Sequence, residues 1–174
     1  MLAPEETTPS EVRRTVAVQI ALTSVFLLLM FVLRSGLDAD PPPIWLIVAL
    51  LVVVGVGAVL CERAWLRITP LAPDVEDPEG RALEVYAAQT TRKLGFGQGT
   101  VLLCVIVAFA ADHAAWPVVI GALPALGVLV FETWPTARNL SLVEAMVEAD
   151  GASTHLIEQF ERDEPTESVE EEDE

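Results

Sequence analysis

Four long runs of apolar residues alternate with polar stretches along this chain. The clearest run, Ile44 to Cys61, contains eighteen residues without a charge or a strong hydrogen-bonding side chain. At about 1.5 Å of rise per residue a helix of this length covers roughly 27 Å, close to the roughly 30 Å hydrocarbon core of a bilayer. The pattern predicts transmembrane helices over about 15–33, 44–61, 94–111 and 116–131.

The connections between these runs predict how the helices pair. The stretch from Ser35 to Pro43 contains three consecutive prolines, and only residues 112–115 separate the third run from the fourth. Such short connections favour antiparallel neighbours, so we expect an all-α, integral membrane four-helix bundle built of two transmembrane hairpins. Pro124 lies in the middle of the fourth run, where its missing N–H and its ring predict a kink.

The polar segments complete the predicted domain organisation. Residues 1–11 have the composition of a disordered N-terminus, followed by a membrane domain over 12–139 with a cytoplasmic connector at 62–93. Residues 140–162 show the apolar spacing of amphipathic cytoplasmic helices. Residues 163–174 read as a disordered acidic tail.

One helix is predicted inside the connector. Asp77 is a typical N-cap residue and Pro78 suits the first helical position, so a helix is expected from Pro78. Gly95, Gly97 and Gly99 either break that helix or lie inside a longer one. Since membrane helices tolerate glycine, we favour continuity with the third span, although the pattern leaves both arrangements open.

Charge predicts the orientation and excludes one class of partner. Nine of the ten Lys and Arg residues lie in the terminal segments and the connector, whereas the two short connections hold only Arg34. Basic residues collect on the cytoplasmic side, so both termini should be cytoplasmic. The net charge is −16, and residues 158–174 contain ten acids and a single base, Arg162. This balance argues against nucleic-acid binding, which requires a basic face.

Candidate chemistry is sparse. Both cysteines lie in apolar runs, and the chain has no metal-ligand spacing, phosphate-binding loop or nucleophile motif, so we expect no enzyme activity, cofactor or metal. Glu62 and Glu132, at the cytoplasmic ends of spans, form either a carboxylate pair for a cation or ion-paired anchors. Asp112 and His113, at the outer edge, form either a pH-sensitive cluster or a solvated turn.

A second group of positions suits helix packing. Gln19 and Thr23 are four residues apart and share one helix face, where they are placed to hydrogen-bond a neighbouring helix. Gly55, Gly57 and Cys61 are small, and we expect them to let another helix approach the second span closely.

Residues 92–151 carry a recognisable order of short motifs. Arg-Lys-Leu precedes the third span, Ala-Ala-Trp-Pro precedes the fourth, and Trp-Pro-Thr-Ala-Arg-Asn-Leu leads into a helix that ends at Ala-Asp-Gly. This order resembles small four-helix bacterial inner-membrane proteins of unassigned function. The resemblance implies a multi-pass protein of the bacterial plasma membrane and brings no functional residues with it.

Two functions follow as expectations. The first is a non-enzymatic accessory or scaffold protein in the lipid bilayer, which engages a protein partner or a second copy through its cytoplasmic helices and acidic tail. The alternative is a small oligomeric transporter or channel. The small four-helix multidrug carriers resemble this chain in helix number, but they have a glutamate in the first span, and residues 15–33 contain none.

Overall fold

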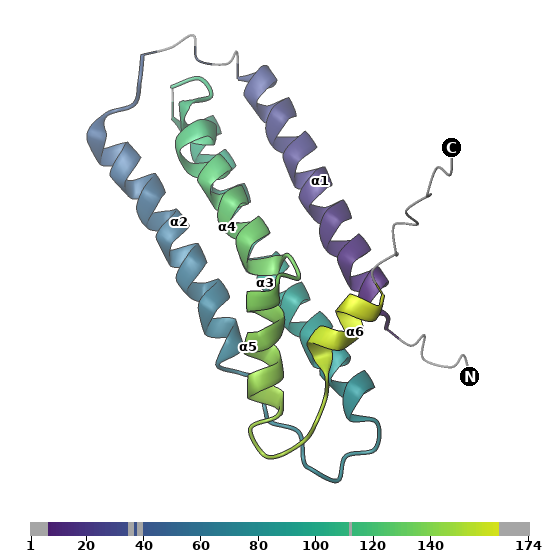
Figure 1. The fold of residues 1–174 in the computed structure, drawn as a ribbon. Helices are drawn as coiled ribbons and strands as arrows, with labels where there is room; N and C mark the ends of the chain where they lie inside the picture. Colours follow the sequence, from purple (N-terminus) through teal and green to yellow (C-terminus); the bar gives the residue numbers. More distant parts are fainter. Residues whose placement is uncertain (1–6, 35–36, 38–39, 112, 164–174) are drawn as a thin grey trace, which may run out of the picture.

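The computed structural model describes residues 7–34, 37, 40–111 and 113–163, and every regular element in these ranges is a helix. The elements in order are α1 (Pro9–Leu33), α2 (Ile44–Trp65), α3 (Pro78–Ala110), the π-helical segment η1 (Val118–Ala122), α4 (Leu123–Thr133), α5 (Ala137–Val147) and α6 (Leu156–Arg162). Helices α1 to α4 lie side by side, whereas α5 and α6 gather at the end where α1 begins (Figure 1). The all-α prediction is confirmed over these ranges.

Helix α1 begins earlier than its apolar run. The Thr8 hydroxyl accepts a hydrogen bond from the Glu11 N–H at 3.3 Å, and the Glu11 carboxylate accepts one from the Thr8 N–H at 3.2 Å. This reciprocal capping box satisfies two backbone donors that the first turn would otherwise leave free. Residues 9–11, which composition assigns to a disordered segment, are therefore helical, while residues 1–6 lie outside the described ranges.

Helix α3 is one unbroken helix from Pro78 to Ala110. The Asp77 carboxylate caps it by accepting from the Gly80 N–H at 3.0 Å, as the N-cap prediction requires. The helix continues through the glycines at 95, 97 and 99, which resolves the alternative that the sequence left open. A Cβ at Gly97 would overlap the Leu129 side chain, so this position has to stay small for α4 to approach α3.

The fourth predicted span is not a uniform α-helix. Its first part, η1, is π-helical, and the Leu123 N–H donates to the Val118 carbonyl five residues earlier. Pro124 follows directly and has no N–H, so an α-helical ladder would leave the carbonyl four residues before it without a partner. The distortion expected at Pro124 takes the form of this wider π-turn.

Beyond α4 the chain turns by 51° into α5. The Thr136 hydroxyl caps α5 by accepting from the Asn139 N–H at 3.3 Å. A turn with Gly151 at a positive φ of 96° then leads toward α6. Helices α5 and α6 correspond to the amphipathic segment predicted at 140–162, and α5 begins three residues earlier, at Ala137.

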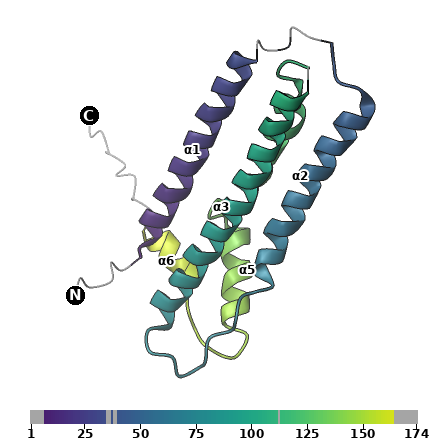
Figure 2. The same ribbon diagram turned by 180° about the vertical axis from the view of Figure 1, so that it is seen from behind.

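Three hydrophobic clusters hold these helices together, the smallest being Val16, Leu94 and Leu129 within the bundle. The first lies between α1, α2, α3 and the η1–α4 segment, and includes Leu50, Val101, Cys104 and Ala122. The second joins the starts of α1 and α3 and the end of α2 to α5 and α6, a unit that we call the base (Figures 1 and 2). Its core residues are Val12, Trp65, Ala82, Leu83, Tyr86, Leu140, Val143, Val147, Leu156 and Phe160.

The outside of the bundle is strongly apolar. Helices α1, α2 and α3 are each long and apolar enough to cross a membrane, and residues 118–147 are a fourth candidate if the bent pair is one span. Only 11% of the most apolar eighteen-residue stretch of α1 is buried within the chain. Large apolar side chains that are more than half exposed include Leu22, Leu28, Val52 and Ile106. Such a surface is unusual for a soluble monomer and typical of an interaction site or a membrane contact.

Candidate functional site

A buried ion pair lies where the bundle meets the base. The Nζ atom of Lys93, on α3, is 2.6 Å from Oε2 of Glu132, at the end of α4. The Lys93 side chain is fully buried and that of Glu132 is 4% exposed. Lys93 Nζ also donates to the Glu132 backbone carbonyl at 3.4 Å. Burying two charges costs several kcal/mol per ion, which only close pairing and additional hydrogen bonds offset.

Helix α2 supplies an aromatic face to this pair. Lys93 Nζ lies 3.3 Å from the centroid of the Trp65 ring, a cation–π contact in a site shielded from water. Trp65 is itself 3% exposed, and its Nε1 has no hydrogen-bond partner within the described residues. The thiol of Cys61, one turn earlier on α2, points toward the Lys93 carbonyl with Sγ at 3.8 Å. The ammonium group is thus enclosed by α2, α3 and α4.

Arg138, at the start of α5, extends the cluster to the surface. Its Nη2 donates to Glu62 Oε1 at 2.7 Å, and its Nη1 lies 3.9 Å from Glu132 Oε1. Its guanidinium also lies over the Phe131 ring, 5.0 Å from the centroid. The hydrogen bond to Glu62 raises the pKa of Arg138 above its usual value. Arg138 therefore links Glu62 and Glu132.

Asn139 fixes the turn that carries Arg138. Its side-chain Nδ2 donates to the carbonyls of Phe131 at 3.0 Å and Trp134 at 2.8 Å. Both carbonyls lie at the end of α4, where helical hydrogen bonding stops, so the side chain satisfies groups that would otherwise lack partners. Asn139 is 1% exposed, which makes this joint between α4 and α5 a packed, specific structure.

The chemistry of this cluster is that of a neutralised charge network. Each buried charge has an opposite charge beside it, and the single exposed carboxylate, Glu62, is bound by Arg138. No group of three His, Cys, Asp or Glu side chains comes together in the described part of the chain as a metal site. The arrangement suits a rigid joint between bundle and base, held by charge as well as by packing.

The structure separates the predicted site residues that it describes between the two ends of the bundle. Glu62 and Glu132 come together through Arg138. His113 lies at the far end of the bundle in the turn between α3 and η1, and Asp112 lies outside the described residues. Arg34 reaches this far end, where it donates to the carbonyls of Ala111 and Ala114.

The predicted packing positions also differ among themselves. The Gln19 amide accepts from the Gln98 amide of α3 at 2.8 Å, whereas the Thr23 hydroxyl bonds within α1, to the Gln19 carbonyl. Gly57 faces Thr100, where a Cβ would overlap that side chain. A Cβ at Gly55 would meet nothing within 4 Å. Contrary to the expectation, Gly55 therefore does not lie against another helix of this chain.

Three residues of the cluster were not singled out from sequence. Lys93, the sole lysine, was counted only among the basic residues that predict orientation, and nothing in the local pattern indicated that it is buried. The local pattern is typical of a residue at the membrane interface for Trp65 and of a surface charge for Arg138. A lysine directly before an apolar run and a glutamate directly after one are a signal for such a pair. That signal becomes specific only once the two runs are known to be neighbours. Comparison with protein-family models, with curated proteins and with solved structures finds no match to this chain.

Proposed function

We propose that this chain is a multi-pass protein of the bacterial plasma membrane, with four spans and both termini in the cytoplasm. The apolar outer surface of α1, α2 and α3 supports the membrane location. The fourth span would run from η1 through α4, and its residues 118–133 cover about 24 Å at 1.5 Å per residue. This length is short for a full crossing, so the span would rely on α1 to α3 around it.

Basic residues support the proposed orientation. The base end of the chain carries most of the arginines, including Arg13, Arg63, Arg81 and Arg138, whereas Arg34 lies at the far end. Basic residues near span ends favour the cytoplasmic side. The base would therefore face the cytoplasm together with the acidic C-terminal segment.

We infer that the protein acts as a non-enzymatic accessory or scaffold subunit, with the base and the acidic segment as its partner-binding part. The observation that carries this proposal is that the base has its own packed core and is joined to the bundle where Lys93 contacts both Trp65 of that core and Glu132. A base that is rigidly attached to the bundle suits docking better than a flexible tail would, because less conformational entropy is lost on binding.

The acidic segment sets the expected chemistry of the partner. Residues 163–174 contain eight Asp or Glu and no Lys or Arg, and they follow directly on α6. A dense negative segment attracts a basic protein surface through interactions that salt screens. The partner should therefore be a protein with a basic patch near the membrane surface.

The test compares partners recovered from native membranes in mild detergent by the full chain and by a chain that ends at Asp163. This truncation leaves α5 and α6 intact, because Val143 and Phe160 of these helices belong to the base core. We expect specific partners to be lost on truncation and weakened at high salt. A full-length variant with Asn and Gln in place of the tail acids separates charge from length. Identical partners from all three chains would overturn this proposal.

A small oligomeric transporter or channel is the second candidate. The observation in its favour is the buried Lys93–Glu132 pair at the end of the bundle, since ionisable groups at membrane depth often mark transport paths. Ion flux in proteoliposomes that falls when Glu132 is replaced by Gln, in a protein that still folds, would favour this candidate. An absence of flux across a broad ion panel would exclude it.

A further inference from the structure

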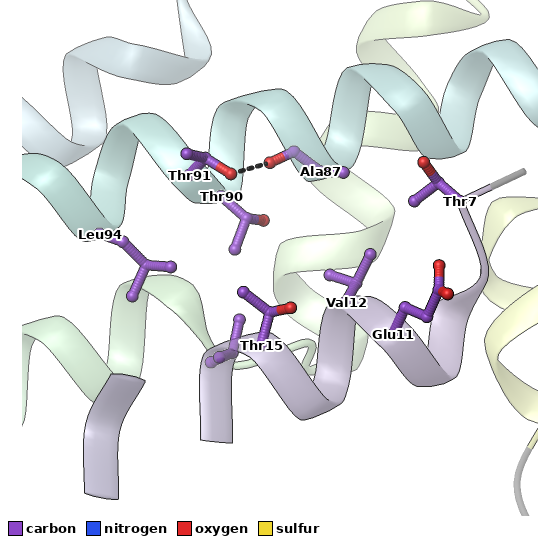
Figure 3. Close-up of a pocket in the computed structure, with 9 residues that line it drawn as sticks. Thr7, Glu11, Val12, Thr15, Ala87, Thr90, Thr91 and Leu94 are labelled. Atoms are coloured by element: carbon purple, nitrogen blue, oxygen red, sulfur yellow. Dashed lines mark hydrogen bonds between the residues drawn. The ribbon is translucent and has the colours of Figure 1, made fainter. Parts of the chain in front are cut away.

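The seam between α1 and α3 contains two cavities in a row. The first, of about 180 Å³, lies at the base end, between the first turns of α1 and the middle of α3 (Figure 3). The second, of about 260 Å³, lies further along the same two helices, between residues 22–26 of α1 and 98–102 of α3. Because α1 and α3 run in the same direction (Figure 2), the two cavities follow one another along the seam between these helices, and we call the two together the groove.

The two cavities differ sharply in chemistry. The first is lined by four threonines, by one charged side chain, Glu11, and by apolar residues that include Val12 and Leu94 (Figure 3). Thr90 is 3% exposed, so this polar lining extends into the protein. The second cavity is almost wholly apolar, with Leu22 and Phe26 among its lining residues. The groove therefore has a polar end at the base and an apolar end within the bundle.

The only charged side chain that lines the polar end, among the described residues, is that of Glu11. Glu11 is exposed, so its carboxylate is accessible from the membrane surface.

We propose that this groove binds one phospholipid with a primary-amine headgroup, a site that rests on the membrane insertion proposed above. The ammonium group would bond to the Glu11 carboxylate and the threonine hydroxyls, because it is a cation with three donors and no acceptor. One acyl chain would follow the groove toward Phe26.

The length of the groove fits one leaflet. Glu11 and Phe26 are fifteen positions apart on α1, or about 22 Å at 1.5 Å per residue. Half of a bilayer of about 40–45 Å, headgroups included, has nearly the same thickness. The hydrogen bond between Gln19 and Gln98 crosses the seam between the cavities, and the acyl chain would lie over this bridge.

The carboxylate at the polar end distinguishes this lipid from other occupants. A transmembrane helix of a partner or of a second copy would bury Glu11 against an apolar face, which is costly. An anionic lipid would bring its phosphate without a cation for Glu11. A choline headgroup has a cation but no N–H donor, so it would form no hydrogen bond with the carboxylate.

The test is native mass spectrometry of the full-length protein in detergent with added lipids of equal chain length. We expect the phosphatidylethanolamine adduct to be about tenfold tighter than those of phosphatidylcholine and phosphatidylglycerol. Replacing Glu11 by Gln should remove this preference while keeping the capping box, since Gln serves at that position. Glu84→Gln is the matched control, because Glu84 is exposed on α3 outside both cavities.

Several results would overturn the proposal. Equal binding of the three lipids, or equal effects of Glu11→Gln and Glu84→Gln, would exclude a specific amine site. Competition by free phosphoethanolamine at millimolar concentration would exclude the need for an acyl chain. A dimer that excludes lipid would assign the groove to a second copy. Resistance of the protein to alkaline extraction from membranes tests insertion separately, so failure of the lipid site is distinguishable from failure of the membrane assignment.

Discussion

The ammonium nitrogen of Lys93 lies 3.3 Å from the centre of the Trp65 ring. Trp65 belongs to the core of the base, whereas Leu94, the next residue after Lys93, packs against Val16 and Leu129 of the bundle. The contact therefore lies at the boundary between two hydrophobic cores. With Glu132 bonded to the same ammonium, a single cation connects three helices at the level where their apolar surfaces end.

Removing one member of the ion pair should destabilise the protein far more than replacing both members by apolar residues. Lys93→Met leaves the buried Glu132 carboxylate with only the more distant Arg138, at 3.9 Å, and Glu132→Gln leaves the ammonium without its anion, so each change should lower the free energy of unfolding by about 3–5 kcal/mol. The double change Lys93→Met with Glu132→Leu should recover most of that loss. Unfolding in mixed micelles measures all three variants.

Glu62→Gln is the control for this cycle, because Glu62 is 47% exposed and its bond to Arg138 is open to water. We expect a loss below about 1 kcal/mol. A double variant as unstable as the sum of the two single changes would show that Lys93 and Glu132 do not act as a pair.

Two glycines of α2 should respond differently to the same substitution. Gly57→Ala places a methyl group against Thr100 and should destabilise the protein by about 1–3 kcal/mol through overpacking. Gly55→Ala meets no neighbour and should be neutral, or stabilising by up to about 1 kcal/mol, since alanine favours the helix. Thermal unfolding of both variants tests this difference, and equal effects would contradict the packing of α2 on α3.

The Gln19–Gln98 hydrogen bond should contribute modestly. Single replacements by Leu and the double replacement form a cycle, and the expected coupling is about 0.6 kcal/mol, as for other hydrogen bonds between membrane helices. The Thr23→Val change is the comparison, because the Thr23 hydroxyl bonds only within its own helix. A coupling of zero would mean that the two amides do not meet in the membrane.

Phe160→Ala should loosen the base selectively. The ring is 1% exposed, packs edge to face on Tyr86 at 5.4 Å between centroids and lies under Arg13. Its loss should cost about 3–5 kcal/mol. Hydrogen exchange should then increase in α5 and α6 and remain unchanged in the bundle half of α3. Uniform faster exchange would show that base and bundle unfold as one unit.

Sequence patterns predicted the helices well and the contacts between them poorly. The caps at Asp77 and Pro78 and the helical character of the apolar runs depend on neighbours within a few residues, so local pattern was sufficient. The π-turn before Pro124 was expected only as a kink, because the form of a distortion depends on what packs around it. Gly55 and Gly57 have the same local signal, and only their rotation on α2 separates them.

The sequence by itself determined that the chain is helical, that its outer surface is apolar and that its charges collect at one end. These properties follow from the composition and pattern of short stretches of sequence. They do not depend on which helices are neighbours. Only the tertiary structure decided that Lys93 lies buried on Trp65 against Glu132 and that Arg138 joins Glu62 to this pair. Such contacts join residues up to 76 positions apart, so they exist only once packing of the helices has set their register.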